Sequence, residues 1–426
     1  MAPTLLTPTQ PTTLTGQTNC VRTLNFMDAQ APMGLEHLLS PLTIDEFVTN
    51  SWGRTFKHVP GVPDKFSHLL PWQRLNEALE QHRLDFPRIR LTRDGERLRP
   101  GSYIRYSKSG QRRAAVPRLR YDKLTQELNS GATLVLDAVD ELYEPLRILA
   151  EALELFFHER IQINAYAGWR TSRGFDLHWD DHDVFILQVT GRKRWMMYGM
   201  TRPYPVTGDP KEPKPTGPPV WDHTLEAGDL LYIPRGFWHV AYPLNEPTLH
   251  LTVGVHNRAG LDLLRWLVER MRSRESFRMD LPRFATAETI EAHLAELRRE
   301  LLAEWDDDIL KRYFADLDAA ALSRPRLSLA CAPVAGSLPS GNMLVKLLAP
   351  RPLNLKLESG IVNFSSQKKE WRLSPEALPI LSHLNKHRVC SVSELCEVAK
   401  SELDERRVRV FLKELLLNGL VAIVEL

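Results

Sequence analysis

The amino-acid sequence predicts an α+β protein built around an antiparallel barrel or jelly roll. Two features along the chain support this fold class. Between residues 160 and 256 the chain holds short apolar or alternating runs separated by Gly, Pro and Asp, a pattern typical of the strands of antiparallel folds. From Gly260 onward the apolar spacing becomes helical, with charged residues on the remaining faces.

The expected strands of the barrel are all short. They are Ile161–Ala165, Val184–Val189, Arg194–Tyr198, Asp229–Ile233 and Leu249–Val255. The proline-rich segment 203–219 is expected to form a loop between two of them. Upstream, Leu42–Val48 has helical apolar spacing, and Thr43 is placed to cap that helix.

The length of the chain favours several domains, because 426 residues exceed what one hydrophobic core usually organises. Residues 1–33 form a Thr/Pro-rich tail that cannot bury a core and is expected to be disordered. The barrel is expected over 34–258 and a helical module over 259–335, which either completes the fold or forms a dimer. Residues 336–426 hold helices that end at Gly419 and a final strand, an order typical of a winged helix.

Composition and charge exclude several classes of protein. The chain is 43% hydrophobic and 25% charged with a net charge of +2, which is ordinary for a globular protein. It has no apolar run of about 18 residues, so no membrane span is expected. The cysteines Cys20, Cys331, Cys390 and Cys396 are scattered without a Cys-x-x-Cys pair, which favours a reducing, cytoplasmic compartment.

One stretch departs from this neutral balance. Arg88–Lys123 contains twelve Lys or Arg residues against three Asp or Glu, with Tyr103, Tyr106 and Tyr121 interleaved. A run of charge is usually a solvated face. The aromatic interleaving also fits a docking surface for an anionic partner, and both interpretations stay open.

A candidate metal site begins at His178-Trp-Asp180. On an extended backbone, residues two apart point the same way, so His178 and Asp180 can face one ion. His239 follows a strand and a sharp turn and can supply a third ligand. Two imidazoles and one carboxylate leave three positions of an octahedral iron(II) open, enough for a bidentate cosubstrate and dioxygen. His182 is the alternative ligand, ranked below His178.

A cosubstrate with a distal carboxylate needs a cation in its pocket. Lys193 begins the strand after the Thr190-Gly191 turn, and its alternative is a solvated hairpin lysine. Thr252 lies on the polar face of its strand and can donate a hydrogen bond. Asn164 and Tyr166 share one strand face and can position cosubstrate or substrate, although Tyr166 also fits simple core packing.

Four motifs together resemble the ribosomal oxygenases, a JmjC-type family, from about Gly34 to the C-terminus. They are His178-Trp-Asp180, Asp183-Val-Phe-Ile-Leu-Gln, Gly191-Arg-Lys-Arg-Trp195 and Gly228-Asp-Leu-Leu-Tyr-Ile-Pro followed by His239. The resemblance implies a double-stranded β-helix that uses iron(II) and 2-oxoglutarate to hydroxylate a ribosomal-protein side chain. It also implies a helical dimerisation module and a winged helix.

The resemblance further implies roles for single residues. The position of Lys193 pairs with the 2-oxoglutarate carboxylate, and Thr252 assists. Arginyl hydroxylases of the family tend to have Arg at the lysine position, whereas histidyl hydroxylases tend to have Lys. Lys193, Asp181 and Asn164-x-Tyr166 therefore favour histidine over arginine as the target. Trp179 departs from the smaller aromatic of the family, which puts the substrate in doubt.

Other functions remain open from the sequence. The substrate can be another peptide or a natural product instead of a ribosomal protein. A non-catalytic cupin-type regulator would keep the metal and use its winged helix. A DNA-binding role is disfavoured, because residues 367–426 hold ten Lys or Arg against nine Asp or Glu. A lysine demethylase would share the iron site, but no zinc or reader module is recognised.

Overall fold

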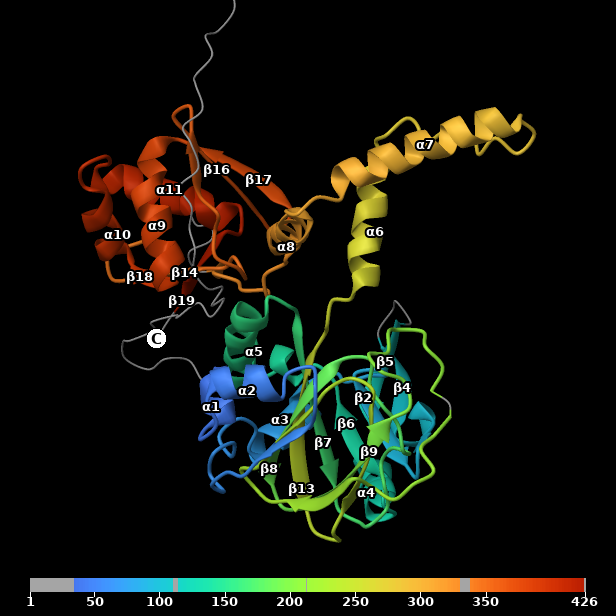
Figure 1. Ribbon diagram of the computed structural model, residues 1–426. Helices are drawn as coiled ribbons and strands as arrows, with labels where there is room; N and C mark the ends of the chain where they lie inside the picture. Colours follow the sequence, from blue (N-terminus) through green and yellow to red (C-terminus); the bar gives the residue numbers. More distant parts are fainter. Residues whose placement is uncertain (1–33, 110–113, 212, 330–337, 425–426) are drawn as a thin grey trace, which may run out of the picture.

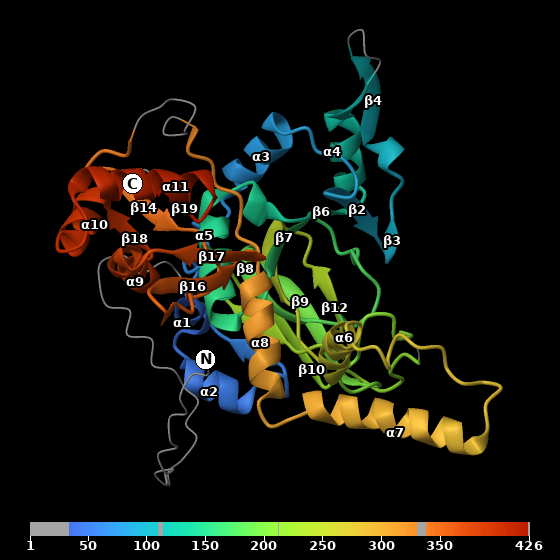
Figure 2. The ribbon, with the colours of Figure 1, turned by 90° about the horizontal axis from the view of Figure 1, so that it is seen from above.

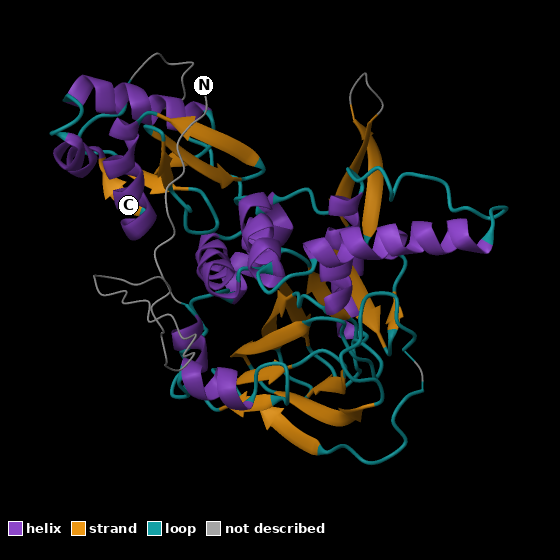
Figure 3. Cartoon of the chain, turned by 45° about the horizontal axis from the view of Figure 1, so that its top comes forward, coloured by secondary structure: helices purple, strands orange, loops and turns teal. Residues whose placement is uncertain are grey.

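The structure is a computed structural model that describes residues 34–109, 114–211, 213–329 and 338–424. Figure 1 shows a β-barrel domain, an arm of helices that rises from it, and a C-terminal part of helices and short strands. Figure 3 shows the strands gathered mainly in the barrel. The tail 1–33, expected to be disordered, lies outside the described residues.

The larger sheet of the barrel has eight strands in the order β1-β11-β8-β13-β7-β6-β2-β3. Neighbouring strands in it are antiparallel. The strands are β1 (Lys57–Val59), β2 (Ile89–Arg93), β3 (Glu96–Arg97), β6 (Thr133–Leu136), β7 (Ile161–Gly168), β8 (Asp183–Thr190), β11 (Leu230–Ile233) and β13 (Thr248–Val255). The sequence predicted β7, β8, β11 and β13, the strands nearest the candidate site.

A smaller sheet closes the barrel, with strand order β10-β9-β12. Its strands are β9 (Lys193–Met200), β10 (Trp221–Leu225) and β12 (Phe237–Pro243). Val184 and Ile186 of β8 share one core cluster with Trp195 and Met197 of β9, so the two sheets pack face to face. The double-stranded β-helix is therefore confirmed. The sequence missed β10 and β12, whose polar and aromatic residues do not alternate.

Helices cover the outer face of the larger sheet. They are α1 (Leu35–Leu39), α2 (Ile44–Asn50), α3 (Trp72–Gln81) and α5 (Glu144–Phe157). The predicted cap of α2 is present, because Thr43 Oγ1 accepts the Glu46 N–H at 3.2 Å. On α5 the buried residues Leu146, Leu149 and Leu153 recur at helical spacing, and each contributes about 1.5–3 kcal/mol by leaving water.

The basic stretch folds into strands and a helix that the sequence did not predict. β4 (Ile104–Ser109) and β5 (Ala114–Leu119) pair as an antiparallel hairpin, and α4 (Tyr121–Asn129) follows it. Figure 2 shows this hairpin projecting from the barrel domain. Its tip, 110–113, lies outside the described residues.

The arm consists of α6 (Gly260–Met271), α7 (Ala287–Glu304) and α8 (Ile309–Ala320). Leu263, Leu267 and Met271 of α6 pack on α8 in a small core. No described residue of α7 is buried, and the helix extends away from the other parts in Figures 1 and 2. Among the described residues, no helix has the length and apolarity needed to span a membrane.

The C-terminal part has its own hydrophobic core, which draws only on residues from Val345 to Val421 among those described. Its elements are β14 (Leu344–Leu347), β15 (Lys356–Glu358), β16 (Ile361–Ser366), β17 (Lys369–Leu373), α9 (Leu378–His387), β18 (Val389–Ser391), α10 (Val392–Ala399), α11 (Glu405–Leu417) and β19 (Val421–Val424). Gly419 has φ +72°, as suits the residue that ends a helix. The winged helix itself stays a prediction.

A buried ionic cluster ties the segment after α8 to the barrel domain. Arg324 donates to Glu154 of α5 at 3.0 Å and to the Ile161 carbonyl at 2.6 Å, and it also pairs with Asp140. The side chains of Arg324, Asp140 and Glu154 are each at most 4% exposed. The start of β7 is therefore held by Asp140 and Glu154, which precede it, and by Arg324, which lies far beyond it in the sequence.

Candidate functional site

The three predicted metal ligands meet at one end of the barrel. His178 and Asp180 lie just before β8, and His239 lies on β12. The backbones of His178 and His239 form a two-residue antiparallel bridge, with N–H to O distances of 3.2 and 2.7 Å. The Gly236 N–H donates to the Asp180 carbonyl at 3.0 Å. These backbone hydrogen bonds hold the segment that carries His178 and Asp180 against the segment that carries His239.

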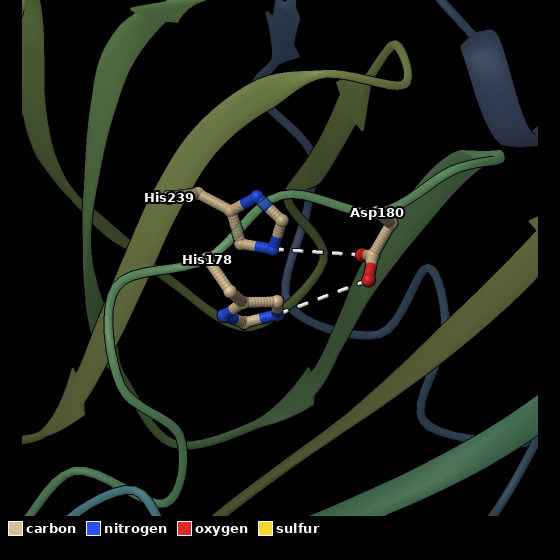
Figure 4. A group of neighbouring side chains, drawn as sticks. All are labelled: His178, Asp180 and His239. Atoms are coloured by element: carbon tan, nitrogen blue, oxygen red, sulfur yellow. Dashed lines mark ion pairs between the residues drawn. The ribbon is translucent and has the colours of Figure 1, made fainter. Parts of the chain in front are cut away.

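The side chains of the triad point toward one another (Figure 4). His178 Nε2 lies 3.9 Å from Asp180 Oδ1, and His239 Nε2 lies 3.6 Å from Asp180 Oδ2. The three ligand atoms lie within 4.8 Å of one another. Donors that bind one metal ion at about 2.1 Å can be at most about 4 Å apart, so the carboxylate and each imidazole are close enough to share an ion.

The two imidazoles are held in the form that binds metal. His178 Nδ1 lies 2.8 Å from the Asp176 carbonyl, and His239 Nδ1 lies 3.0 Å from the Phe237 carbonyl. A carbonyl can only accept, so each Nδ1 carries the proton and each Nε2 keeps its lone pair. Burial, assisted by the neighbouring imidazole of His178, lowers the pKa of His239 to about 4, which also favours the neutral ring.

Asp180 is held as a carboxylate. Burial opposes its ionisation, but the imidazoles of His178 and His239 keep its pKa below the usual value. His182 is not part of the triad: its Nδ1 lies 3.1 Å from Asp181 Oδ1, and its ring packs on His256. The preference for His178 over His182 therefore agrees with the geometry.

A cavity of about 320 Å³ opens beside the triad. It extends into the barrel between the two sheets, because its walls include Val184 and Ile186 of the larger sheet and Trp195 of the smaller one. The predicted residues Lys193, Thr252 and Tyr166 line the same cavity as His178, Asp180 and His239.

Lys193 is buried, with 6% of its surface exposed, so the alternative of a solvated hairpin lysine is wrong. Within the described part of the chain it has no ion pair or hydrogen bond, and its Nζ lies 5.8 Å from the centre of the Trp195 ring. Burial lowers its pKa to about 7. An ammonium group in an apolar site is costly without an anion, so this position suits an anionic ligand.

The other predicted contacts differ in their relation to the cavity. Thr252 and Tyr166 line it, and the Tyr166 ring stacks on His250 with centroids 4.9 Å apart. Asn164 is not among the described residues of its walls. Its Oδ1 accepts the Ala138 N–H and the Gln162 amide, each at 2.9 Å, so Asn164 supports the strand start instead of facing a ligand.

Some cavity residues had no predicted role. His250 and Trp195 face the cavity, and both His250 Nδ1 and Trp195 Nε1 are buried without a hydrogen-bond partner among the described residues. Buried polar atoms of this kind are usually satisfied, so they fit a cavity that receives a polar ligand. Alternation along β13 puts His250 on the same strand face as Thr252, and this pattern could have predicted that His250 faces the cavity.

The proline-rich insertion also contributes to the site. The sequence predicted that this segment is a loop but gave no indication of this contribution. Lys211 lines the cavity, donates to the Trp179 carbonyl at 3.0 Å and lies over the Trp179 ring. Thr207 donates to Asp181 at 2.6 Å, and Lys214 to Asp176 at 3.0 Å. The insertion is thus attached at three points to the loop that carries the first two ligands.

Comparison with known proteins agrees with this geometry. Residues 140–263 match the JmjC domain. The protein named bifunctional lysine-specific demethylase and histidyl-hydroxylase NO66 of Drosophila yakuba is 31% identical over 242 residues, which are 53% of this chain and 32% of that protein. Its counterpart in Drosophila mojavensis is 30% identical, over 53% of this chain and 25% of that protein. The match therefore spans a third or less of these curated relatives.

Solved structures extend the likeness to most of the chain. The Escherichia coli ribosomal oxygenase YcfD superposes with a TM-score of 0.53 and 20% identity, over 90% of this chain and 98% of that one. Its complex with cobalt and 2-oxoglutarate gives a TM-score of 0.54 and 18% identity, over 90% and 99%. At such identity the likeness concerns the fold. Residues 140–263 thus match the JmjC domain, and the fold of the chain is similar to that of a ribosomal oxygenase.

Proposed function

We propose that the protein is an iron(II)- and 2-oxoglutarate-dependent dioxygenase that hydroxylates a histidine or arginine side chain of a ribosomal protein. The observation that carries the proposal is the presence, in one cavity, of the His178–Asp180–His239 triad and the buried, unpaired Lys193. A metal alone does not need such a lysine. A dicarboxylate bound at the metal does, because its far carboxylate would otherwise be buried without a counter-charge.

The residues of the site fit this pair of ligands. The triad would hold iron(II), which together with 2-oxoglutarate and dioxygen supplies the oxidation: the cosubstrate becomes succinate and carbon dioxide, and one oxygen atom enters a substrate C–H bond. The ammonium of Lys193 neutralises the distal carboxylate, and the Thr252 hydroxyl donates to it. The apolar side chains of Val184 and Ile186 exclude water from this end of the cavity.

The charge of the cavity supports histidine over arginine as the target. Among the described residues of its walls, Arg90 is paired with Asp137 and Lys193 would be neutralised by the cosubstrate, which leaves Lys211 as a cation near the metal site. A guanidinium would enter against this charge, whereas a neutral imidazole would not. The NO66 relatives are named bifunctional lysine-specific demethylases and histidyl-hydroxylases, and the second activity in that name points the same way. The likeness to a ribosomal oxygenase supports a ribosomal protein as substrate.

The proposal is tested by turnover with ribosomal proteins. Purified protein with iron(II), 2-oxoglutarate and ribosomal proteins of the host is expected to form succinate and to add one oxygen to a single histidine peptide. Asp180→Ala should lose both products, because the metal loses its only carboxylate ligand. Asp222→Ala is the matched control, since Asp222 is outside the cavity and pairs with Arg194 at 2.7 Å.

Each result has a definite meaning. Succinate formation with no modified ribosomal peptide would retain the oxygenase and direct the search to another peptide or a natural product. An oxidised arginine would reverse the choice between the two residues. If no succinate forms and 2-oxoglutarate does not bind, the proposed oxygenase activity is contradicted and a cupin-type regulator is favoured.

We also propose that the arm makes the protein a homodimer. Leu261, Leu264 and Val268 of α6 are exposed, whereas Leu267 is buried. α7 has eighteen residues with none buried among those described, and it carries exposed Leu294 and Leu302. Isolated helices are marginal in water, so these apolar surfaces fit burial against a second copy.

Charged substitutions on α6 are expected to produce monomers. Leu264→Asp with Val268→Asp, at positions 45% and 62% exposed, should halve the mass seen by light scattering while the circular dichroism spectrum stays the same. Burying two carboxylates in an apolar interface is costly. Lys311→Asp is the control, since it adds negative charge on α8, where the Lys311 side chain is 84% exposed, and it should leave the mass unchanged. A wild-type mass of one chain would contradict the homodimer.

A further inference from the structure

The β4–β5 hairpin carries charge that the rest of the described chain does not neutralise. Other arginines of the basic stretch are satisfied: Arg90 binds Asp137 through two contacts of 2.9 and 2.7 Å, and Arg93 binds Glu127 at 3.2 Å. By contrast, Arg105 and Arg118 form no ion pair with any described residue. The positive charge of the stretch is therefore concentrated on the projecting hairpin.

The register of the hairpin places these two arginines side by side. Arg105 is directly opposite Arg118, so both side chains lie on the same face. Their neighbour Ile104 points to the opposite face and is buried, so the arginine face is directed away from the core. Like charges opposite each other in a hairpin are destabilising, and an anion bound across the pair would remove that cost.

Further cations and an aromatic ring lie at the base of this hairpin. Arg99 precedes the hairpin and Arg120 follows it, and neither has an ion pair among the described residues. Tyr121, at the start of α4, is 54% exposed. No ring contact of Tyr121 occurs within the described residues. An exposed ring beside arginines is the arrangement with which proteins stack unpaired bases and bind their phosphates.

We propose that the outer face of the β4–β5 hairpin, with Arg105, Arg118 and Tyr121, binds a single strand of RNA. The arginines bind successive phosphates, and the tyrosine ring stacks on a base. The aromatic ring favours nucleic acid over an acidic protein. The choice of RNA over DNA rests on the proposed function, since ribosomal proteins are bound to RNA. The hairpin would then hold the enzyme on the RNA that carries its substrate.

The test is salt-dependent binding of a fluorescein-labelled oligouridylate to the full-length protein, measured by fluorescence anisotropy. Arg105→Gln with Arg118→Gln is expected to weaken binding about tenfold or more at low salt. It should also reduce the slope of log K against log salt by about 1.4, the value for two phosphate contacts on a single strand. Arg265→Gln with Arg272→Gln, on the exposed face of α6, is the matched control and should bind as wild type.

Two more variants separate the parts of the proposal. Tyr121→Ala should weaken binding at least about fivefold without changing the salt slope, because stacking releases no counter-ions. Asp180→Ala should bind RNA as wild type, so a failure of the oxygenase and a failure of the RNA surface give different results. Binding that is insensitive to salt, unaffected by the double arginine variant, equally tight for polyglutamate, or tighter for oligothymidylate would overturn the proposal.

Discussion

Lys193→Met is expected to raise the KM for 2-oxoglutarate by about thirty-fold to several thousand-fold, the effect of about 2–5 kcal/mol for removing one partner of a buried charge pair. Methionine is an unbranched side chain one atom shorter than lysine, and it removes the charge. The affinity for iron(II) or cobalt(II) should stay near that of wild type, because Lys193 contacts Trp195 and none of the triad. Calorimetric titration with each metal and then with 2-oxoglutarate measures the two effects separately.

Without 2-oxoglutarate, the same substitution should increase the stability of the protein. Because Lys193 is buried without an anion, the methionine variant should unfold at a higher denaturant concentration than wild type. Arg194→Met, on the next residue of β9, removes an exposed charge and should change neither property. Lys193→Arg keeps a cation and should bind 2-oxoglutarate better than the methionine variant. A stable variant with unchanged affinity would remove Lys193 from the site.

The pH dependence of this affinity follows from the pKa of Lys193. Burial lowers that pKa to about 7, and the carboxylate binds only the ammonium form. Below pH 7 the ammonium is already present, so affinity should be constant. Above pH 7 a proton must be taken up on binding, so affinity should fall by about tenfold per pH unit. Proton uptake shows as a binding heat that depends on the ionisation enthalpy of the buffer.

The titratable groups near Lys193 should not change the pH dependence of the affinity for 2-oxoglutarate. Burial, reinforced by Lys193, lowers the pKa of His250 well below its usual value, so the ring is neutral throughout. Burial raises the pKa of Tyr166, so its hydroxyl is also neutral near pH 7. The range from pH 6 to 9 runs from roughly one unit below to two units above the pKa of Lys193. An affinity for 2-oxoglutarate that stays constant over this range would contradict the role of Lys193 in binding the carboxylate.

Arg324→Ala is expected to lower the free energy of unfolding by about 3–5 kcal/mol, the usual cost of removing one member of a buried ionic cluster. Its loss leaves Asp140 buried without a counter-charge among the described residues, and it leaves Glu154 with the partly exposed Arg160 at 3.5 Å. These carboxylates also accept the N–H groups of Ile163 at 2.8 Å and Ile161 at 3.1 Å. The start of β7 should therefore loosen as well. Urea titration followed by tryptophan fluorescence measures the change.

Arg299→Ala is the comparison for that measurement. Arg299 is an exposed arginine of α7 paired with Glu296 three residues away, and exposed pairs of this kind contribute at most about 1 kcal/mol. If Arg324→Ala changed stability no more than Arg299→Ala, the cluster would not be holding β7 and the later part of the chain together.

The sequence predicted the barrel because its central strands obey simple alternation. On β8, Val184 and Ile186 face the cavity while Phe185 and Leu187 face the helices. Such a strand can be recognised from its own sequence, without knowledge of the strands that pair with it. The metal triad was predictable for a similar reason, since His178 and Asp180 are two apart on extended backbone. Only His239 required information from a distant segment.

Residues whose position depends on loops were not predictable in this way. Lys211 reaches the cavity through an irregular insertion, so no period in the sequence indicates its direction. The β4–β5 hairpin was hidden by its charge, because arginines on an exposed face give no apolar alternation. Asn164 was placed on the correct strand face, but its hydrogen bonds direct it to the Ala138 backbone, which only the folded neighbours determine.

The attachment of the proline-rich insertion has a consequence for how a protein with the proposed activity can acquire new substrates. The insertion leaves β9 and returns on β10, which are adjacent strands of one sheet, so its ends stay fixed whatever its length. Doubling the length of such a loop costs only about 0.6 kcal/mol. Residues such as Lys211 can therefore change through insertion or deletion while the triad stays in register. Evolution can thus select new substrates in this segment without rebuilding the oxidation chemistry beneath it.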